Sequence, residues 1–346
     1  MSNQNEAAAQ QQVPPEAYLI QLALGALVTQ ALYVAAKLGI ADLLAGGPRP
    51  VSELAAETST HERSLYRVLR SLASVGVFRE CDPKVFALTP AAEPLRSDAP
   101  SSLRNGAIFM GEDWHWNVWG NLMHSVRTGK PAWGRTHGVE VFDYFAANPE
   151  CAAIFNGAMT DMSTGVSPAI VEAYDFSEFG AGTIADIAGG HGYMLAQILK
   201  ANPKLGGILF DVAPVIEGAG ELLEREVVAA RVEKVAGDFF ESVPGADAYV
   251  MKHIIHDWDD ERAVAILSNI RKAMRQGAKV LVVESVVPEG DGPHYSKLLD
   301  LEMLASPGGV ERTAEEYAEL FRQAGLRLTR IIPTRSPFSI VEAVAA

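Results

Sequence analysis

The second half of the chain alternates between short apolar runs and longer stretches whose apolar positions recur at helical spacing. Short apolar runs are typical of buried parallel strands, and the longer stretches are typical of crossover helices. The pattern therefore predicts an α/β domain with a Rossmann-like, doubly wound sheet over residues 175–346. The expected strands are Thr183–Ala188, Gly207–Phe210, Arg231–Val235, Ala248–Met251, Val280–Val283, Arg327–Ile332 and Ser339–Val344. The expected helices are Tyr193–Ala201, Val215–Glu226, Asp260–Met274 and Ala314–Ala324.

Residues 51–88 show a different order, two short helices followed by a hairpin. Ser64–Val75 has one apolar face and ends at Gly76, and the turn of the hairpin falls near Cys81–Pro83. This order predicts an N-terminal, winged-helix-like domain over residues 16–102. Such a domain either reads DNA or serves as a dimerisation module.

The charge balance favours the dimerisation module. The chain has 43 acidic and 29 basic residues, a formal net charge of -14 and a pI of about 5.1. A chain of this charge repels the phosphate backbone, and no basic patch compensates. We therefore expect no nucleic acid partner.

The span between Glu16 and Lys37 carries no charge and has the length needed to cross a bilayer. It contains Gln21 and Thr29, however, and neither end has a cluster of basic residues. An uncharged, apolar helix is also typical of a subunit interface. We expect a homodimer formed through this N-terminal domain, and no membrane partner.

The remaining segments and the overall composition complete this outline. Residues 1–15 are expected to be a disordered tail without the basic region of a signal peptide, and residues 103–174 an aromatic-rich helical linker that contributes to a substrate pocket. The 48% apolar content excludes wholesale disorder. Cys81 and Cys151 make neither a disulfide framework nor a zinc site, which fits a cytoplasmic protein without metal.

A glycine-rich turn follows the first expected strand, with Gly189, Gly190 and Gly192 after Asp186. Leu195 takes the place of the third glycine of a dinucleotide fingerprint, so a pyrophosphate-binding turn is poorly supported. Asp186, Asp211 and Asp238 stand at the ends of successive strands, where carboxylates suit a ribose diol and a cationic group. This arrangement predicts a nucleoside that carries positive charge and no phosphate, such as S-adenosylmethionine.

The fourth expected strand leads into Met251–Asp260, which contains His256. A histidine at a strand carboxyl end is suited to general base catalysis, although a structural histidine is the alternative. Glu284 and Glu311 are each placed to orient an imidazole by accepting its second N–H, and Glu311 could instead begin a helix.

Several motifs together resemble the S-adenosylmethionine-dependent O-methyltransferases of the caffeate/hydroxyindole type, a group that includes bacterial tailoring enzymes. These motifs are Asp186–Gly192, Phe210-Asp211, Gly237–Phe240, Met251–Asp260 with its His-Asp-Trp, Glu284-Ser285 and Pro307–Thr313. The resemblance covers nearly the whole chain. It implies a class I methyltransferase fold with a final antiparallel strand, S-adenosylmethionine as the cofactor and S-adenosylhomocysteine as its product.

The resemblance also implies roles for individual residues. His256 is the general base, oriented by Glu284 and Glu311. Two positions depart from the family pattern, namely Ala188 in place of a glycine and His253 where plant members carry an aromatic residue. The cofactor would be held by Asp186, Gly189, Gly190, Gly192, Asp211, Asp238, Phe239, Lys252 and Ser163. The acceptor pocket would include Met159, Met162, Trp116, Asp257, Met303 and Leu304, for which the alternative is core packing.

We therefore expect an enzyme that moves a methyl group to a phenolic or similar hydroxyl of a small aromatic molecule, in secondary metabolism. The first alternative is a relative that binds S-adenosylmethionine for hydroxylation, decarboxylation or pericyclic chemistry. An intact His256 with both glutamates favours methyl transfer, because a protein that transfers no methyl group needs no such base. The second alternative is a winged-helix regulator.

Overall fold

The computed structural model describes residues 14–346, so the expected tail lies almost entirely outside the described residues. Contacts divide the chain into two compact units, with the boundary between Glu112 and Asp113. The first unit thus extends past the expected segment 16–102, because the helix Arg104–Gly111 packs along the first helix of the chain. The segment boundaries given above remain predictions.

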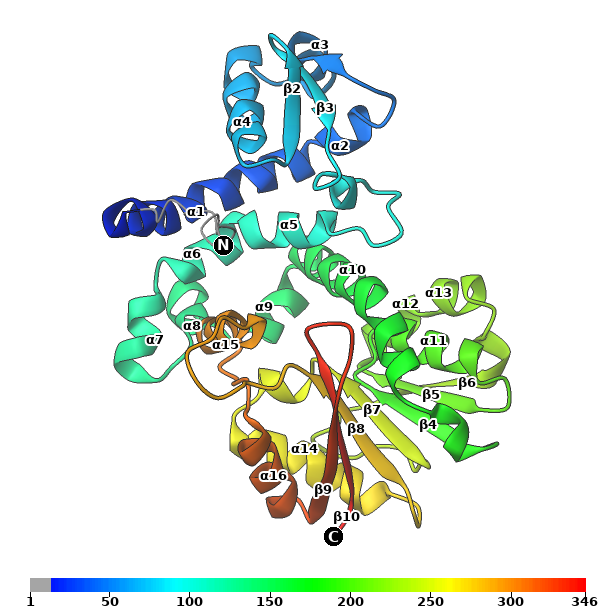
Figure 1. Ribbon diagram of the computed structural model, residues 1–346. Helices are drawn as coiled ribbons and strands as arrows, with labels where there is room; N and C mark the ends of the chain where they lie inside the picture. The colour runs from blue at the N-terminus through cyan, green and yellow to red at the C-terminus, as the bar shows by residue number, and fades with distance from the viewer. Residues whose placement is uncertain (1–13) are drawn as a thin grey trace, which may run out of the picture. The chain divides into compact units, whose positions relative to one another are not determined.

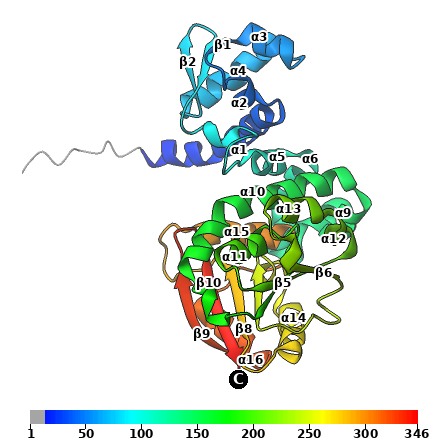
Figure 2. The ribbon, with the colours of Figure 1, turned by 90° about the vertical axis from the view of Figure 1, so that its right-hand side faces the viewer.

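The first unit combines helices with a small antiparallel sheet. Helices α3 (Val51–Glu57) and α4 (Glu62–Ser74) are followed by the expected hairpin of β2 (Phe78–Asp82) and β3 (Val85–Leu88), and a third strand that the sequence did not predict, β1 (Arg49–Pro50), pairs with β3. Figure 2 labels β1 and β2 of this small sheet. The helices are α1 (Pro15–Lys37), α2 (Ile40–Leu43), α3 (Val51–Glu57), α4 (Glu62–Ser74) and α5 (Arg104–Gly111), with the short helix η1 (Glu93–Leu95). The strands are β1 (Arg49–Pro50), β2 (Phe78–Asp82) and β3 (Val85–Leu88).

Helix α1 exposes large apolar side chains along much of its length. Leu19, Ile20 and Leu27 are 65%, 60% and 65% exposed. Helix α1 is long and apolar enough to cross a membrane. Helices of soluble proteins also meet this criterion of length and composition, so the helix is only weak evidence for a membrane span. Where α5 lies against α1, Gly111 leaves no room for a side chain, since a Cβ there would stand 2.1 Å from Tyr33 Cβ.

The second unit contains a seven-stranded sheet in the order β6-β5-β4-β7-β8-β10-β9 (Figure 1). The first five strands along the chain are parallel, and β10 pairs antiparallel with both β8 and β9. Each expected strand is present, and the doubly wound sheet with an antiparallel end is confirmed. The strands are β4 (Thr183–Ile187), β5 (Gly206–Asp211), β6 (Val232–Ala236), β7 (Ala248–Lys252), β8 (Lys279–Glu284), β9 (Leu326–Pro333) and β10 (Ser339–Ala345).

Helices cover both faces of this sheet because alternate strand residues point to opposite sides. Ile184 belongs to the core on one face, which is covered by α10 (Pro149–Ala173) and α11 (Tyr193–Ala201). Ala185 belongs to the core on the other, covered by α14 (Asp260–Ala273) and α16 (Ala314–Gln323) (Figure 1). The short helices α12 (Ala213–Gly218) and α13 (Gly220–Arg225) follow β5.

The prediction of a single helix over Val215–Glu226 is wrong, because the structure has two shorter helices here, α12 and α13. The break falls at Ala219, between two glycines of low helix propensity. Helix α15 (Tyr295–Ala305) was not predicted from the sequence. The expected helical stretch before the sheet is present as α6 (Asp113–Trp119), α7 (Leu122–Thr128), α8 (Ala132–His137), α9 (Val141–Ala147) and α10. Single-turn helices are η2 (Phe176–Phe179), η3 (Ala229–Arg231) and η4 (Ile255–Asp257).

Candidate active site

Four polar side chains from the predicted site stand at the carboxyl ends of neighbouring parallel strands. Asp186 lies near the end of β4, Asp211 ends β5, Lys252 ends β7 and Glu284 ends β8. The strand order reverses at β4, which has β5 on one side and β7 on the other. In open α/β sheets, ligands bind at this edge beside such a reversal.

The glycine turn after β4 is held to the end of β5. The Gly190 amide donates to Asp211 Oδ2 at 2.9 Å, and the Val212 amide donates to Asp211 Oδ1 at 2.7 Å. Gly190 and Gly192 adopt φ values of 60° and 85°, which glycine tolerates. Ala188 adopts φ 53°, so the residue that departs from the glycine pattern holds a left-handed conformation.

The space around this turn fits a ligand that approaches the backbone closely. A Cβ built on Gly190 would meet no protein atom within 4 Å, whereas one on Gly189 would stand 2.6 Å from Asp186 Cγ. Asp186 is 1% exposed, and its Oδ2 has no hydrogen-bond partner among the described residues. Burial raises the pKa of Asp186 to about 7, although the charge of Lys252 opposes this.

This donor and acceptor set fits S-adenosylmethionine. The buried Asp186 carboxylate, whose Oδ2 has no hydrogen-bond partner within residues 14–346, suits a cationic group of a ligand, and Asp211 suits a ribose diol. Burial lowers the pKa of Lys252 to about 8, against the charges of Asp186 and Asp257. Among residues 14–346, no group of His, Cys, Asp and Glu side chains is arranged to hold a metal ion.

Aromatic side chains border the next part of this edge, after β6. Asp238 is exposed, and its Oδ1 accepts from the Phe240 amide at 2.8 Å. Phe239 and Phe240 meet the ring of Trp258 edge-on, with centroid distances of 5.9 and 4.9 Å. Asn269, which the sequence analysis missed, donates to the carbonyls of both phenylalanines at 3.0 and 2.8 Å and so fixes their turn.

The candidate base lies in a loop that we call the base loop, residues 254–258, in which Ile255 and His256 are buried and the other residues are half-buried. His256 is 5% exposed, and its Nδ1 lies 2.5 Å from Glu311 Oε1. Its Nε2 lies 3.5 Å from Asp257 Oδ1. Burial opposes the charged imidazole, but Asp257, Glu311 and Glu284 outweigh it and raise the pKa of His256 to about 9. Burial in turn raises the pKa of Asp257 to about 7.

Glu284 holds the base loop through its main chain. The amides of Ile254 and His256 both donate to Glu284 Oε1 at 3.1 Å, and the Tyr317 hydroxyl donates to Oε2 at 2.5 Å. Within the described residues, Glu284 makes no hydrogen bond to the imidazole. The structure thus brings both predicted glutamates to His256 but at different atoms, and only Glu311 contacts the ring.

The segment before α16 holds the opposite side of the base loop. The Val310 amide donates to the His256 carbonyl at 2.9 Å, and a Cβ on Gly309 would stand 1.8 Å from that oxygen. Arg312, 1% exposed, donates to the carbonyls of Ile255 and Trp258 at 3.2 and 2.9 Å. Sequence reasoning missed these contacts, although the Pro307–Thr313 motif contains the residues that make them.

His253, the second departure from the family pattern, packs beneath the base. Its ring stacks on the His256 ring with a centroid distance of 5.3 Å and meets Phe338 edge-on at 4.2 Å. It therefore occupies an aromatic position. Burial lowers the pKa of His253 well below its usual value, and the charges of Lys252 and His256 act in the same direction. Its φ of 57° is a strained, left-handed conformation.

Five of the six predicted acceptor residues come from three helices of the second unit, and the sixth, Asp257, lies in η4 beside His256. His115 Nε2 lies 2.9 Å from Glu302 Oε1, which joins α6, the helix of Trp116, to α15, the helix of Met303 and Leu304. Met159, Met162 and Ser163 lie on α10, where Met162 packs against the core and the Ser163 hydroxyl donates to the Met159 carbonyl at 2.7 Å. Met303 is buried, and Trp116, Met159 and Leu304 are half-buried.

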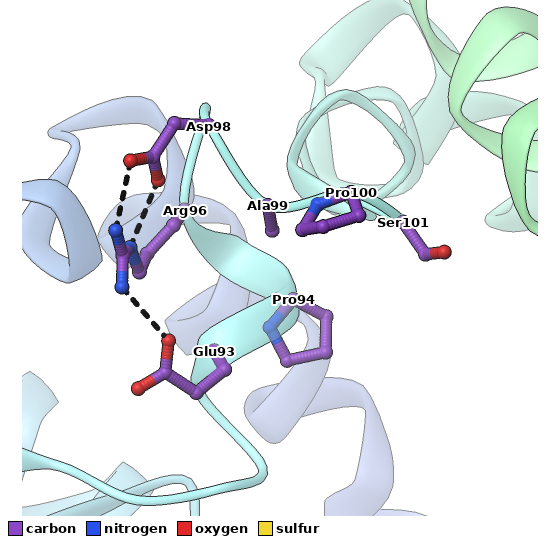
Figure 3. Close-up of a pocket in the computed structure, with 7 residues that line it drawn as sticks. All are labelled: Glu93, Pro94, Arg96, Asp98, Ala99, Pro100 and Ser101. Carbon is purple, nitrogen blue, oxygen red and sulfur yellow. Dashed lines mark hydrogen bonds and ion pairs between the residues drawn. The ribbon is translucent and has the colours of Figure 1, made fainter.

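A surface pocket of the first unit offers no comparable chemistry (Figure 3). The positive charge in this pocket belongs to Arg96. Asp98 and Glu93 neutralise it through hydrogen bonds of 2.8 to 3.1 Å. None of the predicted site residues lines it. The lining residues are Glu93, Pro94, Arg96, Asp98, Ala99, Pro100 and Ser101.

Comparison with known proteins identifies the family. A family model described as an O-methyltransferase domain matches residues 119–327, and one described as an O-methyltransferase dimerisation domain matches residues 20–98. The chain is 46% identical to a phenazine O-methyltransferase of Lysobacter antibioticus, over 99% of each protein. The match to the dimerisation model favours a dimerisation module over a DNA-reading one.

Solved structures agree with this assignment. The crystal structure of LaPhzM, 46% identical, matches with a TM-score of 0.92 over 96% of this chain and all of that one. An O-methyltransferase of neocarzinostatin biosynthesis, solved with S-adenosylmethionine and 2-hydroxy-5-methyl naphthoic acid, is 34% identical, with a TM-score of 0.78 over 92% and 96% of the two chains. The chain therefore belongs to the O-methyltransferase family and is an S-adenosylmethionine-dependent O-methyltransferase with an N-terminal dimerisation domain.

Proposed function

We propose that His256 is the general base that accepts the proton of an aromatic hydroxyl during methyl transfer. The observation that carries the proposal is the buried pair of His256 and Glu311, joined at 2.5 Å beside the carboxyl ends of β7 and β8. Glu311 accepts from Nδ1–H, so Nε2 of the uncharged imidazole can receive the proton. Because the pKa of His256 is raised to about 9, the share of this uncharged form increases as the pH rises toward that value. A base oriented by a carboxylate in this way is a recurrent catalytic arrangement.

The chemistry asked of these residues is modest. A phenol has a pKa of about 10 and is mostly protonated at neutral pH. S-adenosylmethionine, when bound, supplies an electrophilic methyl group. His256 removes the hydroxyl proton as the oxygen attacks, so free phenoxide need not form in water. The base loop fixes the imidazole in place, and such positioning avoids the entropy cost of bringing base and substrate together.

For the acceptor, we propose a flat aromatic molecule with a hydroxyl, and a phenazine as the first compound to test. The phenazine O-methyltransferase at 46% identity and the naphthoic acid in the neocarzinostatin enzyme support a fused ring. The aromatic packing of Trp114, Trp133 and Phe145, with centroid distances of 5.6 to 6.1 Å, gives α6, α8 and α9 a rigid apolar interior.

His256→Ala tests the catalytic proposal, with purified protein and a panel of hydroxyphenazines and hydroxynaphthoates. We expect kcat to fall by ~10²–10⁴, as loss of a general base should cause. Calorimetry should show S-adenosylmethionine affinity within about twofold of the parent. Full activity in the variant would refute the base assignment, and an acceptor that is consumed without gaining a methyl group would favour a different reaction on the same cofactor.

We further propose that the protein is a cytoplasmic homodimer joined through α1. The exposed Leu19, Ile20 and Leu27 support an interface on this helix, because isolated proteins rarely expose such a continuous apolar surface. Leu19→Glu together with Leu27→Glu should convert the dimer to a monomer in light scattering. A double variant that remains dimeric would place the interface elsewhere. Within residues 14–346, neither Cys81 nor Cys151 forms a disulfide, which fits a reducing compartment.

A further inference from the structure

A tyrosine outside the predicted site completes the hydrogen bonding of Glu284. Tyr317 lies in the first turns of α16, whose start is fixed by a capping box between Thr313 and Glu316. Its side chain is fully buried, and its hydroxyl donates to Glu284 Oε2 at 2.5 Å. Burial raises the pKa of Tyr317 well above its usual value, and the charge of Glu284 adds to this, so the hydroxyl remains a donor.

Glu284 has a specific set of partners. It is 0% exposed, and hydrogen bonds reach it from the amides of Ile254 and His256 and from the Tyr317 hydroxyl. The two amides share Oε1, so the hydroxyl is what fixes Oε2. A carboxylate that is hydrogen-bonded at one oxygen alone can rotate about the bond between Cγ and Cδ. The hydrogen bond from Tyr317 to Oε2 therefore keeps Oε1 directed at the base loop.

The base loop depends on this carboxylate for its shape. Its single turn, η4, is too short to satisfy its own amides, and the amides of Ile254 and His256 reach outward to Glu284. The backbone amide and the imidazole belong to the same residue, His256, so a shift of the amide also moves the imidazole relative to Glu311. A small displacement of a catalytic base lowers the reaction rate strongly.

We propose that Tyr317 is a positioning residue for methyl transfer: its hydroxyl locks Glu284 against the main chain of the base loop and thereby holds His256 in its reactive place. The inference rests on the proposed function of His256. Tyr317 touches neither the imidazole nor Glu311 through any hydrogen bond that the described part of the chain shows. Its effect is therefore exerted on kcat, and cofactor binding is spared.

Tyr317→Phe removes this hydroxyl and little else, and Tyr249→Phe is its matched control. Tyr249 is also fully buried in the second unit, where its hydroxyl donates to the Pro244 carbonyl at 3.0 Å and accepts from the Ala246 amide at 2.9 Å. Both variants lose a buried, bonded hydroxyl, but the partners of Tyr249 do not belong to the base loop. Any effect common to both variants is therefore structural.

We expect Tyr317→Phe to lower kcat by about tenfold to a hundredfold, in line with the loss of a hydrogen bond to a charged group. S-adenosylhomocysteine affinity by calorimetry and KM for S-adenosylmethionine should stay within about twofold of the parent. Tyr249→Phe should keep kcat within about twofold. Equal kcat values for the two variants, or a loss in Tyr317→Phe that falls on KM alone, would overturn the inference.

Two further variants separate this inference from the proposal on which it rests. In a His256→Ala background, Tyr317→Phe should cause no further loss, because a positioning residue acts only through the group that it positions. Additive losses would overturn the inference, whereas full activity in His256→Ala alone would overturn the base assignment. If Tyr317→Phe fails to fold, Glu284→Gln tests the same contact, because it replaces one of the two carboxylate oxygens that accept from Tyr317 and from the base loop. We expect this variant to lower kcat and to retain cofactor affinity. An unchanged kcat would refute the inference.

Discussion

The charge of Glu311 should set the pH range in which the enzyme works. Glu311→Gln keeps an oxygen that can accept from His256 Nδ1 but removes the carboxylate charge from the 2.5 Å contact. Burial already opposes the charged imidazole of His256, and Asp257, Glu311 and Glu284 together raise its pKa to about 9. Loss of the Glu311 charge therefore lowers the pKa of His256.

The size of the shift follows from the strength of the lost interaction. A hydrogen bond to a charged group contributes about 1.5–3 kcal/mol, and 1.36 kcal/mol corresponds to about one pKa unit. The pKa of His256 should thus fall by about 1–2 units. Because a general base must be unprotonated, the rise of kcat with increasing pH should move to lower pH by the same amount.

The assay is the initial rate of S-adenosylhomocysteine release between about pH 6 and pH 10, at saturating cofactor and acceptor. Glu315→Gln is the matched control, because it makes the same change of charge on an exposed side chain in the first turn of α16. Its profile should coincide with that of the parent. A profile of Glu311→Gln that is unmoved, or displaced to higher pH, would refute the reasoning.

Three other substitutions address the turns and carboxylates of the site. Gly309→Ala should lower kcat by at least about tenfold, because its Cβ would collide with the His256 carbonyl at 1.8 Å, whereas Gly292→Ala meets no atom and should be neutral in the same assay. Ala188→Gly should raise the unfolding free energy by up to about 1 kcal/mol in urea titration, because relief of left-handed strain exceeds the added chain entropy. Asp186→Asn should raise the Tm of the ligand-free protein at pH 8 but not at pH 4. Burial raises the pKa of Asp186 to about 7, so the folded state resists ionisation of this group and loses up to about 4 kcal/mol of stability by pH 7. The same change should weaken S-adenosylmethionine binding in calorimetry.

The sheet could be predicted because its central strands are buried on both faces and therefore read as continuous apolar runs. Val280–Val283 and Ala248–Met251 fall within β8 and β7 for this reason. Residues that bear chemistry could be placed because strand ends mark the sheet edge, which is how Asp186, Asp211 and Glu284 were assigned to one region. The break at Ala219 was not predicted, because the helical pattern of apolar positions continues across it.

Contacts between distant segments could not be predicted in this way. The sequence indicated two glutamates near one histidine but not which atoms they contact, since Glu311 reaches the imidazole and Glu284 the main chain. The sequence pattern did not indicate a role for Tyr317, and it marked Arg312 only as part of the Pro307–Thr313 motif. Their roles depend on how far α16 lies from the base loop, and spacing along the chain does not specify that distance.

One strand end positions both carboxylates that act on His256. β8 ends at Glu284, and two residues later Val286 forms a parallel bridge with Arg312, where the Val287 amide donates to the Arg312 carbonyl at 2.9 Å. The bridge aligns the segment that contains Glu311 with the extension of β8. Glu284, which contacts the main chain of His256, and Glu311, which contacts its ring, are therefore held by the same stretch of backbone. A displacement of this stretch would move both together, so the base keeps its orientation unless the bridge itself opens.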